Sequence, residues 1–474
     1  MRKFSYLILI LLMMDSAVYA QIMFGLCNSN YAGLGGIKIN PSSMSDSRLR
    51  WDANVISLSA FAQNNFLSIP AGSLNFSSLT SGDTSGVNLH FGSNVADVYA
   101  FADVFTKLPS LMLNLPKLPK HSFAFSTNFR AMASGQVPFY IMKFISPGAD
   151  YNTSADYVGD VIRLGTLGWM EFSGSYSTVL KDRGQDFFAA GATLSWLRAV
   201  MGMYMANRQV GTVPAAYDST VYYNVNGEYG RAFAVFAGGG IGADLGATYE
   251  RRKKNAGWIS IYKSKPLRTY EYRIGASLLD ILGSVNLHNN AMQMIVGAGD
   301  TPIIDSIIPI ARKNAGTVDS LLNTKFFHYS AGDSSDNFKM RIPPAFSLQC
   351  DYNFYKDRVY LNLAIVQRLT GKSSALLRPN FISFTPRFES KWIEVAMPVT
   401  YYDYTRVMIG AAIRIHSFYI GTDQIGPLIG ASDLNGISLY FGLKISAFKE
   451  RKGLKDEGAY SKSLIKVIRP FQKK

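Results

Sequence analysis

The sequence predicts an all-β protein: a transmembrane antiparallel β-barrel of about 14 strands, roughly 12 to 16, with a small N-terminal plug segment. Three observations predict this fold class. Many segments alternate apolar and polar residues with a period of two, and the chain begins with a predicted export signal. No later stretch has the run of about 20 apolar residues that a membrane helix needs.

The clearest alternating segment is residues 436–448, near the end of the chain. Successive side chains of a strand point to opposite faces, so one face of this segment is apolar and the other is small or polar. We expect the apolar face to contact outer-membrane lipid and the other face to line the lumen. The predicted lipid-facing residues are Ile437, Leu439, Phe441, Leu443 and Ile445; the predicted lumen-facing residues are Tyr440, Lys444 and, from an earlier segment, Arg414.

Other segments show the same pattern, separated by polar turns. Residues 359–366 and 407–416 alternate clearly, whereas the earlier segments fit less tidily. The predicted earlier strands are residues 51–61, 122–129, 169–178, 187–197, 232–251 and 270–282, and the predicted external loops are residues 77–92, 146–160, 210–223 and 297–339.

The first 20 residues have the features of a secretory signal peptide. Arg2 and Lys3 precede an apolar run at 4–14, and small residues before position 21 suit a cleavage site. We therefore predict four parts, which are a signal peptide (1–20), a plug segment (21–47), an outer-membrane barrel (48–448) and a basic tail (449–474). An even number of strands would place both mature termini in the periplasm.

The composition agrees with a barrel. Charged residues make up 17% of the chain, below the roughly 25% of soluble domains, and aromatic residues make up 13%. The net charge is +15, but the cations are scattered among strands and turns, so we expect no nucleic acid partner. Two cysteines, Cys27 and Cys350, could form one disulfide in an oxidising compartment or remain free thiols.

No catalytic or metal-binding pattern is present in the sequence. The histidines do not cluster, and there is no nucleophile elbow, zinc-protease or phosphate-loop motif. We predict no catalytic residue, no metal and no cofactor, and we do not expect an enzyme.

Several short motifs resemble a known family. The segment 31–44 is glycine-rich and ends in an Asn-Pro-Ser motif, and Asp-Ser-Arg follows at 46–48. Residues 240–249, 272–280 and 420–423 match later strands of the same pattern. Together they resemble the Bacteroidetes DUF5723 outer-membrane barrels, which are distantly similar to FadL-type transporters and to the PorV component of type IX secretion. The resemblance implies an N-terminal segment folded inward as a plug, with a plug motif of Gly35, Gly36, Asn40 and Pro41.

Two functions follow from this resemblance. The first is a FadL-like conduit for hydrophobic or amphipathic small molecules, and the alternative is a PorV-like structural or interaction component of a secretion or surface-assembly complex. The expected partners are outer-membrane lipid, a hydrophobic small-molecule ligand, and periplasmic or secretion-complex proteins bound through Lys449–Lys474. This tail has nine Lys or Arg and three acidic residues, a net +6, and a solvated tail is the plainer interpretation.

Overall fold

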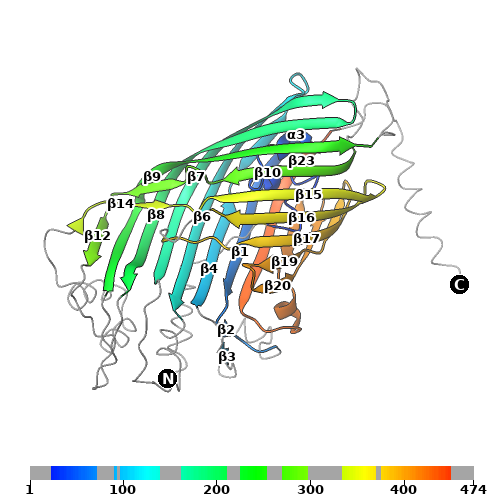
Figure 1. The fold of residues 1–474 in the computed structure, drawn as a ribbon. Coiled ribbons are helices and arrows are strands. Elements are labelled where there is room, and N and C mark those ends of the chain that lie inside the picture. The colour runs from blue at the N-terminus through cyan, green and yellow to red at the C-terminus, as the bar shows by residue number, and fades with distance from the viewer. Residues whose placement is uncertain are drawn as a thin grey trace.

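The computed structural model describes residues 23–71, 90–92, 97–138, 162–210, 225–253, 269–296, 334–369 and 375–449 (Figure 1). The predicted signal peptide and nearly all of the predicted tail lie outside these residues. The first half of the chain contains α2 (Leu34–Ile37), α3 (Ser43–Asp46), β1 (Leu49–Asn64), β2 (Leu67–Ser68), β3 (His90–Phe91), β4 (Asp97–Lys107), β5 (Ser110–Asn114), β6 (His121–Pro138), β7 (Arg163–Arg183), β8 (Asp186–Val210) and β9 (Val225–Arg252).

The second half is built almost entirely of strands. Its elements are β10 (Tyr270–Leu279), β11 (Ser284–Leu287), β12 (Ala291–Val296), β13 (Ser334–Ser335), β14 (Phe338–Arg341), β15 (Ala345–Tyr355), β16 (Val359–Arg368), β17 (Phe381–Glu389), β18 (Ile393–Ala396), β19 (Val399–Tyr402), β20 (Arg406–Ile409), β21 (Ala411–Ile415), β22 (Phe418–Thr422), the 3-10 helix η3 (Gly426–Ile429) and β23 (Gly436–Phe448).

The strands close into a barrel. Neighbours pair antiparallel around the sheet, and β1 pairs with β4 and β5 on one side and with β23 on the other. Some barrel strands are interrupted and appear as several short ones. For example, β10, β11 and β12 follow one another along β9 and together form one barrel strand. Within the described residues the wall is a ring of 14 strands, so the predicted fold class is confirmed.

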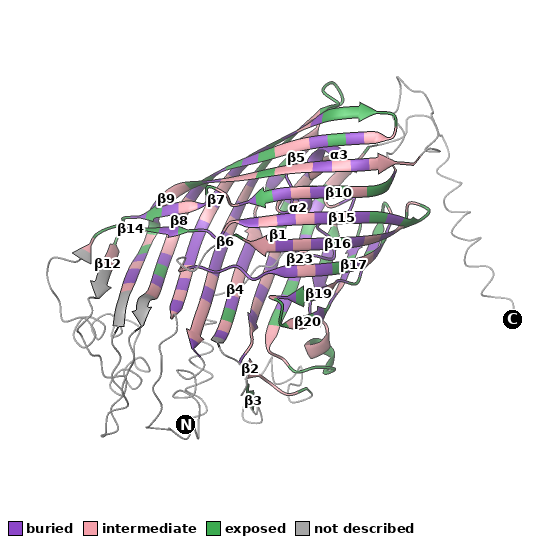
Figure 2. Cartoon of the chain, in the orientation of Figure 1, coloured by how far each residue is buried: buried purple, intermediate pink, exposed green. Residues whose placement is uncertain are grey.

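Burial alternates along the strands with the expected period of two (Figure 2). In β21, Ile413 is exposed on the outer face while Arg414 is buried on the inner face. The outer surface carries many exposed large apolar residues, and the inner surface carries buried Ser, Thr, Asn and charged residues. An apolar outside and a polar inside are what a barrel needs in lipid, since its closed wall leaves no unpaired strand edge.

A β-bulge keeps this alternation correct in β1. The register with β23 shifts between Asn54 and Ile56, so Val55 and Ile56 are both exposed outward. Asp52 and Asn54 point inward before the bulge, and Ser57 points inward after it. One extra residue therefore keeps the polar side chains in the lumen along the whole strand.

The structure extends the predicted strands and adds several that the sequence pattern missed, among them β4, β5 and β17. In β4 the buried residues Phe101 and Phe105 alternate with the apolar residues Ala102 and Val104. Apolar residues on both faces hide a period of two. The end of the predicted loop at 297–339 overlaps β13 and the start of β14. The rest of that loop, residues 297–333, lies outside the described residues. The same is true of the predicted loops at 146–160 and 210–223, apart from Val210.

The two rims of the barrel differ in their connections. At the rim where β1 begins, tight turns join β7 to β8, β15 to β16 and β21 to β22. Longer connections join β6 to β7, β8 to β9 and β12 to β13 at the opposite rim. The chain also leaves β23 at the first rim, where the backbone N–H of Lys449 donates to the Arg48 carbonyl at 3.0 Å. No helix in the described part of the chain is long and apolar enough to cross a membrane.

Candidate functional site

Residues 23–48, here called the N-terminal segment, lie inside the barrel (Figure 1). Two single-turn helices, α2 and α3, and a series of turns fold this segment compactly. Gly33 has φ +57°, and an added Cβ would lie 2.7 Å from Asp52 Cγ, so glycine is required there. The buried apolar side chains of the N-terminal segment pack against the inner wall of the barrel: Met23, Phe24, Leu26, Leu34, Ile37, Ile39 and Met44.

Three glycines on adjacent strands form a groove that receives the Asn-Pro-Ser motif. A Cβ on Gly191 of β8 would lie 2.6 Å from the Ser42 backbone nitrogen. A Cβ on Gly246 of β9 would lie 2.9 Å from Pro41 Cδ, and one on Gly275 of β10 would lie 2.7 Å from Asn40 Nδ2. We call Gly191, Gly246 and Gly275 the glycine groove. Only residues without a side chain let the segment approach the wall this closely.

Asn40 is bonded within this groove. Its Nδ2 donates to the Ala247 carbonyl at 3.1 Å and to Gln349 Oε1 at 3.0 Å. Its Oδ1 accepts from the backbone N–H of Ser42 at 3.0 Å, which closes a local turn. A further wall contact follows at Ser45, whose Oγ lies 2.6 Å from Ser177 Oγ. The motif is therefore satisfied by the strands that it touches.

Charged side chains of the wall hold the rest of the segment. Arg273 forms an ion pair with Asp46 at 2.8 Å and another with Asp351 at 3.3 Å. Lys107 Nζ donates to the Leu34 carbonyl at 3.0 Å, and Lys444 Nζ donates to the Tyr31 carbonyl at 2.6 Å. These charges are shielded from water, where such contacts are strong and costly to break.

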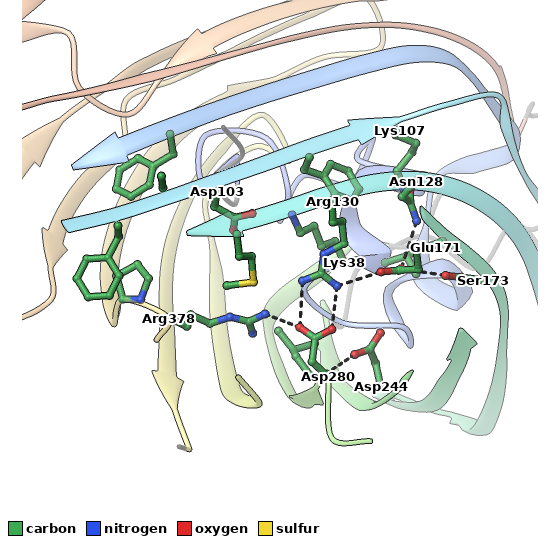
Figure 3. A pocket seen from close by; sticks show the side chains of 18 of the residues that line it. Lys38, Asp103, Lys107, Asn128, Arg130, Glu171, Ser173, Asp244, Asp280 and Arg378 are labelled. Carbon is green, nitrogen blue, oxygen red and sulfur yellow. Dashed lines mark hydrogen bonds and ion pairs between the residues drawn. The ribbon is translucent and has the colours of Figure 1, made fainter. Parts of the chain in front are cut away.

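A cavity of about 60 Å³ lies between the N-terminal segment and the wall (Figure 3). A chain of ion pairs runs along it. Arg130, at mid-height in β6, pairs with Glu171 at 3.0 Å and with Asp280 at 2.8 Å. Arg378 pairs with Asp280 from the other side, and the backbone N–H of Asp280 donates to Asp244 at 2.6 Å. The cavity wall also contains aromatic and apolar residues, namely Phe61, Phe101, Phe105, Met132, Leu377 and Phe381.

A second, smaller cavity of about 30 Å³ adjoins the segment near Arg273 and Asp351. Since one water needs about 10–15 Å³ by this kind of measure, the two cavities have room only for a few waters or a small chemical group. Neither of these two cavities is large enough to form an open passage through the lumen.

The sequence-predicted site residues occupy definite places. Ile437, Leu439, Leu443 and Ile445 are 40–52% exposed on the outer face, and Phe441 is half-buried on the same face. Arg414, Tyr440 and Lys444 are buried inside. All three face the N-terminal segment. Arg414 lies over the Tyr31 ring at 5.0 Å, the Tyr440 hydroxyl lies 2.8 Å from where a Cβ of Gly25 would be, and Lys444 binds the Tyr31 carbonyl.

The plug-motif residues differ in their surroundings. Asn40 and Pro41 fill the glycine groove, as described above. A Cβ on Gly36 would lie 2.9 Å from Ser43 Oγ, so close packing requires glycine at this position. A Cβ on Gly35 would meet nothing within 4 Å, and its φ is not positive. The structure gives no steric reason for glycine at position 35.

The two cysteines, left open by the sequence, are free thiols. Cys27 is buried inside the barrel, and burial raises the pKa of its thiol. Cys350 in β15 alternates with the inward-facing Gln349 and Asp351, so it points outward. The wall separates the two sulfur atoms, which excludes a disulfide in this arrangement.

The cavity charges were not singled out by sequence reasoning, although some lay within its motifs. Lys38 belongs to the N-terminal motif and Asp280 ends the motif at 272–280, but nothing local marks them as neighbours. Asp103 and Arg130 interrupt apolar strands at inward positions. Such an intramembrane charge is a signal for function that could have been used. Among the described residues, no group of three or more His, Cys, Asp or Glu is placed to hold a metal ion.

These features define the class of the protein as a transmembrane β-barrel whose lumen is filled by its own N-terminal segment. The chain belongs to the family of unknown function DUF5723, whose model matches residues 41–423. The glycine groove and Asn40 explain part of the family-like pattern in this chain, because Gly246 and Gly275 come from the motifs at 240–249 and 272–280. No curated protein matches the sequence.

Several solved structures are similar at low identity. The Ralstonia pickettii toluene transporter TbuX is 10% identical, with 88% of this chain and 94% of that chain covered and a TM-score of 0.39. A Pseudomonas aeruginosa FadL homologue is 10% identical, with 92% of this chain and 100% of that chain covered and a TM-score of 0.41. The Pseudomonas putida toluene transporter TodX is 10% identical, with 90% of this chain and 98% of that chain covered and a TM-score of 0.40.

Proposed function

We propose that the protein is an outer-membrane channel for small amphipathic molecules, closed by its N-terminal segment and opened when that segment moves. The outer face supports a membrane location. Leu194, Trp196 and Val407 are 54–63% exposed there, and such residues are stable in lipid rather than in water. Ile437, Leu439, Phe441, Leu443 and Ile445 continue this apolar face, and we assign them to lipid contact.

The observation that carries the proposal is the way in which the N-terminal segment is held. Every described contact that ties it to the wall is noncovalent, and many are hydrogen bonds of the Asn40 and Ser45 kind. Each such bond contributes about 0.5–1.5 kcal/mol net, and the buried ion pairs such as Arg273–Asp46 contribute more, so the segment is held firmly but reversibly. A segment that served only as permanent core would not need a groove without side chains and a charged cavity beside it.

The cavity lining indicates the chemical class of the cargo. Phe61, Phe101 and Phe381 provide apolar surface, while Arg130 and Asp280 provide charge. A purely hydrophobic molecule would leave the unbonded Lys38 ammonium and Asp103 carboxylate oxygen at this cavity without a hydrogen-bond partner, which is unfavourable. An amphipathic molecule satisfies both kinds of surface.

A second function is favoured by the filled lumen. A barrel without a continuous passage also suits a PorV-like component of a secretion or surface-assembly complex, which would bind partners at its rim. The basic tail, Lys449–Lys474, would then contact periplasmic proteins. Its first residue lies beside the start of β1, where Lys449 Nζ donates to the Ser47 carbonyl at 2.6 Å, so the chain leaves β23 at the rim where β1 begins.

Reconstitution into liposomes tests the channel function. Deletion of residues 23–46 should produce solute-dependent swelling or large ion conductance that the intact protein lacks. A milder variant, N40A/S45A, keeps the segment and should raise the frequency of open events. If both variants insert as folded barrels and neither conducts, the channel function is wrong. A pull-down in which the intact chain recovers periplasmic proteins, and the chain truncated after Phe448 does not, would then favour the interaction function.

A further inference from the structure

Two opposite charges at the main cavity have no hydrogen-bond partner. The Nζ of Lys38 and the Oδ1 of Asp103 are both shielded from solvent and unbonded. Lys38 follows α2, and Asp103 points inward from β4 (Figure 3). Lys38 Nζ lies 3.8 Å from the centre of the Phe105 ring, a cation–π contact. Buried charges normally have partners, so this pair requires an explanation.

The other charges of the cavity do not supply those partners. Arg130 and Arg378 direct their guanidinium groups at Asp280, and Glu171 completes the chain through Arg130. Lys107 donates to the Leu34 carbonyl. The ion-pair network thus largely satisfies itself and leaves one ammonium and one carboxylate oxygen available. Arg130 Nε and Asn128 Oδ1 add one more donor and one more acceptor without a partner.

The rest of the lining is apolar and largely aromatic. Phe61, Phe101 and Phe381 pack together in one buried cluster, with the Phe61 and Phe381 ring centroids 6.2 Å apart. Leu377 belongs to the same cluster, and Met132 lies beside the charges. A ligand that fits this surface needs a compact charged end and an apolar body.

We infer that this cavity binds a small amino-acid-type zwitterion with an aromatic or aliphatic body. Its carboxylate would accept from Lys38 Nζ, and its ammonium would donate to Asp103 Oδ1. The cavity, about 60 Å³, has room for the charged end, which displaces a few waters. The body reaches the aromatic cluster by displacing Phe24 of the N-terminal segment, whose ring packs on Phe381 at 5.3 Å. This inference deepens the proposed channel function and depends on it for biological meaning, but the binding itself can be tested without transport.

The charge requirement makes the inference specific. A ligand with only a carboxylate would leave Asp103 without a partner, and one with only an ammonium would leave Lys38 without one. An unsatisfied buried charge costs enough free energy to lower affinity about tenfold or more. A neutral ligand would leave both charges unsatisfied.

Competition binding on detergent-purified full-length protein tests this. The probe is tritiated L-phenylalanine, and the unlabelled competitors are phenylalanine, 3-phenylpropionate, 2-phenylethylamine and propylbenzene. We expect phenylalanine to compete at least about tenfold better than either singly charged analogue, because only it satisfies both groups. K38M should abolish the advantage over 2-phenylethylamine, and D103N should abolish the advantage over 3-phenylpropionate.

Matched controls separate binding from folding. K117M and D336N change exposed residues away from the cavity and should leave the order of competitors unchanged. If a single variant fails to fold, K38M/D103L removes both charges together and should reverse the order, so that, with tritiated propylbenzene as the probe for this variant, propylbenzene competes better than phenylalanine. Equal competition by all four compounds, no binding of phenylalanine, or an unchanged order in K38M/D103L would overturn the inference. Conductance after deletion of 23–46 would still report separately on the channel function.

Discussion

Gly191 of β8 and Ser42 of the N-terminal segment are in backbone contact inside the barrel. A Cβ added to Gly191 would lie 2.6 Å from the Ser42 nitrogen and 2.8 Å from its Cα. Neither backbone atom can rotate away as a flexible side chain would. Gly191 also pairs with Gly246 across the sheet, so the segment approaches the wall closely where two adjacent strands lack side chains.

Replacing Gly191 with alanine should therefore lift the Asn-Pro-Ser motif from its groove. We expect overpacking to cost about 1–3 kcal/mol and to raise the frequency of open events in planar bilayers. Limited proteolysis between residues 30 and 44 should also become faster. Gly174→Ala is the matched control, since an added Cβ at this outward position of β7 meets nothing within 4 Å. Equal behaviour of the two variants would contradict the role of the groove.

Arg273 should be a major determinant of how firmly the segment is held. Arg273→Met leaves Asp46 without its ion pair at 2.8 Å, in a site where the Asp46 side chain is only 3% exposed. Removing one partner of a buried pair costs about 3–5 kcal/mol. We expect a clear fall in the temperature at which the barrel loses its compact mobility in gel electrophoresis.

The control for this variant is an exposed ion pair. Lys181 pairs with Asp186 at 3.1 Å with 56% of the Lys181 side chain exposed, so Lys181→Met should cost less than about 1 kcal/mol. If Arg273→Met is no more destabilising than Lys181→Met, the buried contacts do not hold the segment.

Phe441→Arg tests the assignment of the outer face. Phe441 lies at the middle of β23 on the face shared with Leu439 and Leu443. An arginine at the bilayer midplane costs about 2–4 kcal/mol, whereas one near the interface costs about 0–1. Ile415→Arg, at the rim end of β21, is the interfacial control. Folding efficiency into lipid vesicles should fall much more for Phe441→Arg, and equal efficiency would place this face away from the hydrocarbon core.

The seating of the N-terminal segment should strengthen as the pH rises above 8. Burial lowers the pKa of Lys38 from 10.5 to about 8 when the segment is seated, whereas a released segment regains the ordinary value. Between these values the released state binds more protons, so raising the pH favours the seated state. The charged groups that face Lys38 are Asp103 of β4, Arg130 of β6, Asp280 after β10 and Arg378 before β17.

Open probability should accordingly fall between about pH 7 and about pH 9.5. Lys38→Met removes the titrating group and should flatten this change. If open probability changes with pH equally in Lys38→Met and in the unaltered protein, a group other than Lys38 causes the pH response.

Sequence reasoning predicted the barrel well because one physical pattern repeats along the chain. The alternation in 436–448 needed no knowledge of any partner strand, and β23 ends at Phe448 as predicted. It missed β4, where Phe101 and Phe105 on one face and Ala102 and Val104 on the other make both faces apolar. It could not predict the cavity, because Lys38, Asp103 and Asp280 come together only when three distant parts of the chain meet in the lumen. The contact of Asn40 with Gly246 and Gly275 likewise depends on strand register, which no local pattern sets.

A reversible crosslink between the N-terminal segment and the wall tests the central claim most directly. Ser45 Oγ and Ser177 Oγ are 2.6 Å apart, so cysteines at both positions are placed to form a disulfide. Cys27 and Cys350 would first be replaced by alanine. The control pair is S383C/T400C, because Ser383 and Thr400 lie 2.9 Å apart on two wall strands, so their disulfide would join wall to wall and not the segment to the wall.

Solute flux into proteoliposomes should be measured for both pairs, oxidised and then reduced, in the N40A background, where the segment is loosened. The account predicts that oxidation of S45C/S177C abolishes flux, that reduction restores it, and that S383C/T400C conducts equally in both states. Undiminished flux through oxidised S45C/S177C, with the disulfide verified by mass spectrometry, would contradict a moving N-terminal segment as the gate.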